Sequence, residues 1–249
     1  MADIGLVEML ILQGIVLLAA VSGSMLSFGF GMVSMPFLLI WLDPVQSVEI
    51  NLVLTGVLFG LISLQTWRHV ERSTLFSLVS GAVLGASLGT YVSATIPDFA
   101  LRFIFTSAIL ITALLGVAGQ LKYISREAVA GVPVGICYGF LNAGMALGGP
   151  VVALFALNQQ WARDTTRAML SSFFLITCVL GLAFHAIGGL LSYQDLLAGM
   201  IFIPSLTAGV FVGVRLVGHV DETLFRRLIL LVMIATSLGV FIREIIRIL

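Results

Sequence analysis

Two apolar runs interrupted by glycines, one in each half of the chain, carry residue types that can bind an anion. The first reads SGSMLSFGFGMVSMPFLLI over residues 22–40, and the second reads GICYGFLNAGMALGGPVVALF over residues 135–155. A continuous helix is disfavoured there, because glycine loses more backbone entropy and proline lacks a donor. A half-helix starting at such a break presents unpaired N–H groups and a partial positive charge. It can therefore hold an anion without a buried lysine or arginine.

The candidate substrate ligands are the helix-breaking residues and the neutral hydrogen-bonding side chains beside them. The helix-breaking residues are Gly29, Gly31, Pro36, Gly144, Gly148, Gly149 and Pro150. The polar candidates are Ser24, Ser27, Ser34, Asn51, Asn142 and Ser171, with Ser22, Thr55 and Ser172 nearby. A serine in a membrane helix often bonds the carbonyl of its own preceding turn, and a buried amide serves equally well as a contact between helices. These alternatives stay open for each residue.

Two arginines follow the second run. Arg163 and Arg167 are four residues apart and so share one helix face at the expected cytoplasmic mouth. They either draw anions toward the pore or set the topology of the chain.

The remaining ionisable residues do not suggest an enzyme. The three histidines are scattered. His185, at the end of a span, is expected as an interfacial side chain, with a proton relay or pH sensor as the alternative. No acidic residue is expected in the middle of a span, which argues against a carboxylate proton relay. We therefore expect no catalytic residue, no metal site and no cofactor.

The composition is that of a membrane protein. Of 249 residues, 60% are hydrophobic and only 10% are charged, whereas a soluble domain carries roughly 25% charged residues. The mean hydropathy is +1.17. The formal net charge is zero, so nothing suggests nucleic acid as a partner. The expected partners are the lipid bilayer and a small anionic substrate.

The order of apolar segments predicts an all-α polytopic membrane protein with two inverted repeats. Each repeat is a glycine-broken, re-entrant helical segment followed by three transmembrane helices. The N-terminal repeat, 1–122, has its broken segment at 6–42 and spans at 47–67, 74–95 and 99–120. The C-terminal repeat, 123–249, has its broken segment at 128–157 and spans at 165–187, 194–216 and 223–243.

One internal match supports the duplication. Gly85, Gly89 and Arg102 recur at a constant offset as Gly209, Gly213 and Arg226. Glycines spaced by four residues let membrane helices pack closely, and they permit a homodimer without requiring one.

The distribution of lysines and arginines favours inverted halves with the N-terminus outside. This arrangement places most basic residues on the cytoplasmic side, as membrane proteins generally do, whereas parallel halves divide them equally between the two sides. Both termini are then expected in the periplasm, although Arg243 and Arg247 near the C-terminus are left outside.

At SFGFGMVSMPFLLI and GFLNAGMALGGPVVALF the chain resembles the sulfite exporter TauE/SafE family of membrane permeases. The run GAVLGASLG and the matching G-x-x-x-G of the second half support the resemblance, which covers essentially the whole chain. The resemblance implies transport of small sulfur-containing anions, such as sulfite or sulfonates, across a bacterial inner membrane. It maps the central site onto Gly29, Gly31, Pro36, Gly148, Gly149 and Pro150.

The sequence therefore predicts a secondary transporter, by family analogy an exporter, that works by alternating access around a midplane anion site. An anion channel of the same architecture and a membrane assembly factor without transport activity remain the alternatives.

Overall fold

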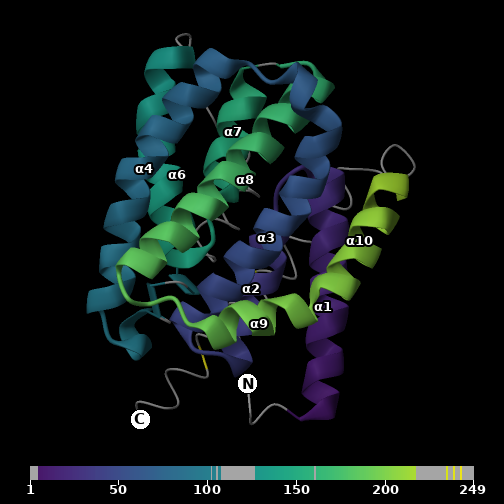
Figure 1. Cartoon of the computed structure of the whole chain (residues 1–249), viewed down its shortest axis with the longest axis vertical. Helices are drawn as coiled ribbons and strands as arrows, with labels where there is room; N and C mark the ends of the chain where they lie inside the picture. Colours follow the sequence, from purple (N-terminus) through teal and green to yellow (C-terminus); the bar gives the residue numbers. More distant parts are fainter. Residues whose placement is uncertain are drawn as a thin grey trace.

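The computed structural model describes residues 5–101, 103–104, 106–107, 127–159 and 161–216, together with residues 234, 238 and 242. This part of the chain is helical throughout (Figure 1). Its α-helices are α1 (Leu6–Leu26), α2 (Phe30–Trp41), α3 (Pro44–Thr66), α4 (Arg72–Thr95), α6 (Glu127–Met145), α7 (Gly149–Asn158), α8 (Arg163–Ile187), α9 (Tyr193–Ile201) and α10 (Ile203–Leu216). A short 3-10 turn, η1 (Trp67–His69), joins α3 to α4.

Several of these helices meet the length and hydropathy requirements of a membrane span. Within the described residues they are Leu6–Leu26, Pro44–His69, Arg72–Thr95 and Asp164–Ile187. About 20 apolar residues cross the hydrocarbon layer as a helix. The prediction of an all-α polytopic membrane protein is confirmed. The expected spans at 99–120 and 223–243 lie mostly outside the described residues, as do Arg102 and Arg226, so the inverted repeat stays a prediction.

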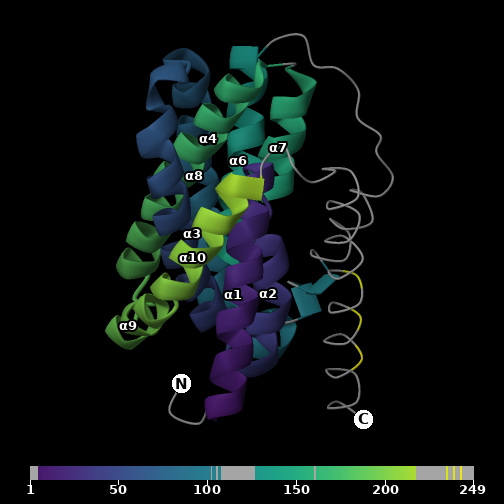
Figure 2. The same ribbon diagram turned by 90° about the vertical axis from the view of Figure 1, so that its right-hand side faces the viewer.

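Both glycine-rich segments form helical hairpins. In the first, α1 ends at Leu26 and α2 starts at Phe30, and in the second, α6 ends at Met145 and α7 starts at Gly149. Figures 1 and 2 show the α1–α2 hairpin opening toward the lower end of the bundle and the α6–α7 hairpin toward the upper end. The two breaks therefore approach each other inside the bundle from opposite directions.

Helices α4 and α6 pack with their backbones in contact. A Cβ atom at Gly81, Gly85 or Gly89 of α4 would lie 2.1, 2.0 or 2.4 Å from a backbone carbonyl oxygen of α6. The reverse holds for Gly135 and Gly139 of α6 against α4, at 2.1 and 2.3 Å. Real Cβ atoms do not approach this closely, so only glycine permits this spacing. The second glycine pair, Gly209 and Gly213, brings α10 similarly close to α1.

The stretch expected as one span at 194–216 is bent. Helices α9 and α10 meet at an angle of 47° around Phe202, a completely buried side chain. Figure 1 shows α9 crossing the lower end of the bundle before α10 rises beside α1. Helix α9 also packs against α3.

Candidate functional site

The two hairpin breaks begin with the same backbone conformation. Each is three residues long, and each starts with a non-glycine residue in the left-handed region: Ser27 at φ 60° and Ala146 at φ 53°. An L-residue in this region costs roughly 1–2 kcal/mol. Gly29, the last residue of the first break, has φ 99°, where glycine is the residue that fits without strain. Such strained positions cluster at functional sites, and here they occur at equivalent places in both hairpins.

The breaks touch each other. A Cβ atom on Gly31 would lie 2.3 Å from the carbonyl oxygen of Ala146, and one on Gly149 would lie 3.8 Å from the backbone nitrogen of Gly29. The first turn of each hairpin's second helix thus faces the break of the other hairpin. Gly148 is covered by Tyr138, whose ring a Cβ atom at that position would meet at 2.6 Å.

A small cavity lies at this meeting point. Its lining residues are Gly29, Phe30, Gly31, Thr55, Phe59, Tyr138, Asn142, Ala146, Gly149 and Phe174. Its volume is about 20 Å³, enough for one water molecule, which needs roughly 10–15 Å³. A sulfur oxyanion is several times larger than water, so this conformation is contracted around the site. The two hairpins must separate before the cavity admits a sulfur oxyanion.

The electrostatics of the cavity favour an anion. None of the described residues that line it is charged. No side chain caps the N-terminus of α2, so the N–H groups of its first turn keep their capacity to donate. The amide nitrogen of Asn142 is buried and, among the described residues, makes no hydrogen bond, although it approaches the Cys178 thiol. Helix dipole, free N–H groups and an unpaired amide donor all offer positive potential to a ligand.

Asn51 holds α2 and α3 together at the edge of the site. Its amide nitrogen donates to the Ser34 hydroxyl, which donates in turn to the carbonyl of Phe30 at 2.8 Å. Its amide oxygen accepts from Thr55 at 3.0 Å. Because both ends of the Asn51 amide are used within the protein, it is a positioning group beside the cavity, whereas Asn142 has a donor to spare.

The structure brings four of the candidate residues together around the cavity: Gly29, Gly31, Asn142 and Gly149. Ser27 and Gly148 belong to the breaks themselves, and Pro36 lies buried within α2. Pro150 is in the first turn of α7. Ser27 and Gly148 thus lie at the meeting point of the hairpins, whereas Pro36 lies two turns further along α2.

Other candidates lie elsewhere. Ser24 donates to the Ala20 carbonyl and contacts α10 at Gly213. Ser171 donates to the Ala168 carbonyl and also contacts the Thr66 hydroxyl. Gly144 packs against α4. Arg163 and Arg167 lie in the first turns of α8, at the end of the bundle where the α6–α7 hairpin opens (Figure 1).

Sequence reasoning missed the aromatic wall of the cavity. Tyr138 and Phe174 stack with ring centroids 5.6 Å apart, and Phe59 lies 4.6 Å from Phe174. One signal was available, because residues spaced by four share a helix face. Tyr138 precedes Asn142 by four residues, and Phe59 continues the series of Asn51 and Thr55 along α3.

Helices long enough to span a bilayer, two broken hairpins and a buried uncharged cavity between the breaks define an α-helical membrane transporter. The family model of the sulfite exporter TauE/SafE family matches residues 12–240. The chain belongs to this family, as the sequence motifs predicted. No curated protein and no solved structure matches the chain.

Proposed function

We propose that this protein is a permease, not an enzyme, and that it carries small sulfur-containing anions such as sulfite and sulfonates by alternating access. The observation that carries the proposal is the convergence of a helix N-terminus and the unpaired Asn142 amide on an uncharged cavity between the hairpin breaks. A tetrahedral oxyanion needs several donors from different directions, and this cavity offers them at close range. Export is the direction that the family name suggests.

The small size of the cavity supports alternating access as the mechanism. A cavity with the volume of about one water molecule is too small to conduct an anion, so the described part of the chain shows no open pore at this site. We propose that the α1–α2 and α6–α7 hairpins move apart alternately toward the two ends of the bundle. Such movement exposes the same donors first to one side of the membrane and then to the other.

Transport in proteoliposomes tests the proposal, with sulfite, sulfoacetate, taurine, sulfate and acetate as the panel. We expect saturable uptake that is selective for sulfur oxyanions and accelerated by anion on the opposite side. Flux without this acceleration would identify a channel. No uptake of any anion by folded protein would overturn the proposal in favour of an assembly role.

Asn142→Leu is expected to weaken anion binding about tenfold or more while leaving stability unchanged or higher. A lost hydrogen bond to a charged ligand is worth roughly 1.5–3 kcal/mol, and tenfold corresponds to about 1.4 kcal/mol. Removing a buried amide whose nitrogen is unpaired relieves a desolvation cost in the empty protein. Isothermal titration with sulfite and thermal unfolding measure the two quantities.

The control for Asn142→Leu is Ser87→Ala, which removes an exposed hydroxyl of α4 that bonds only within its own helix. A destabilised Asn142→Leu with normal sulfite affinity would mean that Asn142 is a contact between helices.

We also propose that the protein lies in a bacterial inner membrane with both termini in the periplasm. The excess of lysines and arginines on the opposite side supports this orientation. A reporter fused to the C-terminus distinguishes the two sides, and a cytoplasmic signal would contradict the inverted halves.

A further inference from the structure

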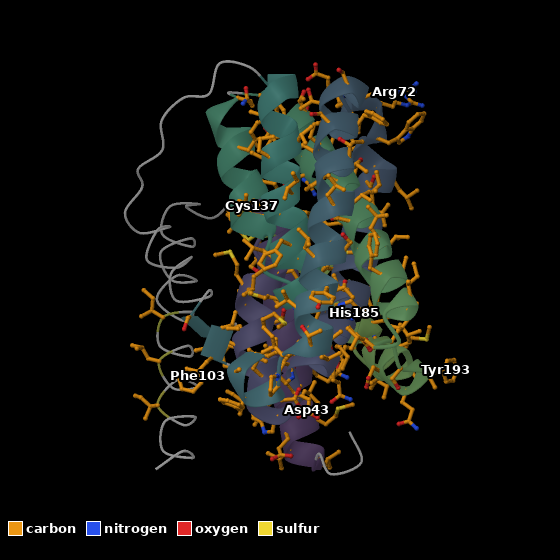
Figure 3. All side chains as sticks on the ribbon, turned by 90° about the vertical axis from the view of Figure 1, so that its left-hand side faces the viewer. Asp43, Arg72, Phe103, Cys137, His185 and Tyr193 are labelled. Atoms are coloured by element: carbon orange, nitrogen blue, oxygen red, sulfur yellow. The ribbon has the colours of Figure 1, made fainter. Side chains whose placement is uncertain are left out.

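An acid and a histidine lie fully buried between α3 and α8, on the lower side of the cavity. Glu49 and His185 are each 0% exposed, and the carboxylate Oε1 lies 3.2 Å from the imidazole Nδ1. The sequence had suggested an interfacial His185, and the structure corrects this point by burying the side chain completely. Glu49, in the second turn of α3, is buried with it. Figure 3 shows His185 between the level of Cys137 and the lower end, where Asp43 and Tyr193 lie.

The hydrogen bonds of the pair require a shared proton. The other ring nitrogen of His185, Nε2, lies 2.9 Å from the carbonyl oxygen of Ala143, which can only accept, so Nε2 carries a hydrogen. A neutral imidazole has one N–H, which would leave Nδ1 as an acceptor facing a carboxylate that also only accepts. Two acceptors would repel at this distance. The pair therefore holds one further proton between Nδ1 and Oε1.

The shared proton stabilises the buried Glu49, which has few other hydrogen-bond donors around it. The second oxygen of Glu49 accepts from the backbone nitrogen of Ser192 at 3.3 Å, in the segment that leads into α9. Without the shared proton, Glu49 would be a buried carboxylate with this single donor, which is costly in a low-dielectric interior. Loss of the proton therefore favours a conformation in which α3, α8 and the start of α9 separate.

No other described ionisable group competes closely for this role. Among the described residues, Glu49 makes its ion pair with His185. Asp195 of α9 accepts a hydrogen bond from the side chain of Gln46 on α3. Asp43 precedes the first turn of α3. Cys178 lies two turns back on α8, while Arg72 of α4 and Glu127 of α6 start their helices at the opposite end of the bundle.

The pair is joined to the anion cavity through α3 and through the hydrogen bond of His185 to α6. Ala143, which accepts from His185, is the neighbour of Asn142 on α6, and Glu49 is two residues before Asn51 on α3. The protonated pair thus fixes the end of α6 in the conformation whose cavity is too small for an anion. Proton binding and anion binding consequently favour different arrangements of the same helices.

We propose that Glu49 and His185 form the proton site of an anion–proton antiporter, in which the proton and the anion are bound alternately. This inference rests on the proposed transport function. The pair takes up one proton from the side where α9 lies, and the contracted cavity has then released its anion. When the proton leaves on the other side, α6 is freed and the cavity opens to the next anion. With this end in the periplasm, inward proton movement drives anion export.

Binding at several pH values tests the inference, with sulfite and ethanesulfonate as the probes on the purified full chain. One competing proton lowers the anion affinity of the wild type by up to about tenfold per pH unit as the pH falls. Glu49→Gln resembles the protonated acid and holds no exchangeable proton. We expect it to bind anions weakly and without this slope. Sulfite's own titration cancels when the variant and the wild type are compared at each pH.

Asp195→Asn is the matched control, since it removes an acid from the neighbouring helix at the same end and should keep the wild-type slope. A dye-based count of protons released when ethanesulfonate binds to the wild type gives an independent reading, with about one proton per anion expected, because this sulfonate carries no proton of its own near neutral pH. Because this measurement uses the wild type, it tests the inference even if Glu49→Gln fails to fold.

The possible failures are distinguishable. A wild type that binds and transports neither probe would overturn the proposed function and this inference together. A wild type that transports sulfite but binds ethanesulfonate without releasing a proton would leave the transporter standing and remove the antiport. A Glu49→Gln variant with the wild-type slope would make the pair a static structural contact.

Discussion

Gly85→Ala is expected to prevent the protein from folding. The added Cβ atom would lie 2.0 Å from the carbonyl oxygen of Ile136 and 2.7 Å from the nitrogen of Phe140, which are both backbone atoms of α6. A flexible side chain could move aside, but here a whole helix must shift. We expect a destabilisation above about 4 kcal/mol, which is exceptional for a single substitution. Size-exclusion profiles and thermal unfolding in detergent measure it.

Gly56→Ala is the matched control for Gly85→Ala. Its Cβ atom would lie 3.5 Å from the Cβ atom of Cys178, an ordinary van der Waals distance. Because alanine favours a helix over glycine by about 1 kcal/mol, this variant should be at least as stable as the wild type. A Gly85→Ala protein with the wild-type unfolding temperature would show that α4 and α6 can separate freely.

The sequence predicted close helix packing at these glycines but not their partners. The spacing of Gly81, Gly85 and Gly89 indicates a small-residue face, yet spacing says nothing about which helix it meets. The structure packs this face of α4 against α6, whose Gly135 and Gly139 in turn lie against the backbone of α4. Helix type and approximate ends follow from local composition, whereas the choice of partner depends on the packing of the whole chain.

The sequence likewise predicted only part of the candidate site, namely the two breaks but not the roles of the serines. The breaks lie at Gly29 and Gly148, but for different reasons. Gly29 has a positive φ that favours glycine, whereas a Cβ atom on Gly148 would collide with Tyr138. The serines were harder to assign, since Ser24 and Ser34 both bond the preceding turn of their own helices. A hydroxyl's choice between helix backbone and ligand is not visible in a sequence.

The buried pair of Glu49 and His185 was beyond sequence reasoning. The two residues are 136 positions apart and come from different halves of the chain. Each is near the end of an apolar segment, where a charged side chain usually reaches water. Only the packing of α3 against α8 and α9 removes that water, so burial and pairing arise together from the tertiary structure.

Gly31→Ala is expected to reduce sulfite transport to background while the protein still folds. The new Cβ atom would lie 2.3 Å from the carbonyl oxygen of Ala146 and 3.4 Å from the amide oxygen of Asn51. The substitution therefore forces the first turn of α2 away from the other hairpin's break. The donors around the cavity then no longer converge on one point, and the contracted state of the cycle is blocked. Flux in proteoliposomes and sulfite titration measure the loss.

The folded state should survive Gly31→Ala because only the hairpin ends meet there, unlike the full length of contact between α4 and α6. Overpacking of this kind typically costs about 1–3 kcal/mol. Gly14→Ala on α1 is the control, since nothing lies within 4 Å of its Cβ position. Gly29→Ala separates backbone strain from contact between the hairpins. Nothing lies within 4 Å of its Cβ position, so the φ of 99° introduces strain without a new contact. If Gly29→Ala loses transport and Gly31→Ala keeps it, backbone conformation rather than contact between the hairpins governs the site.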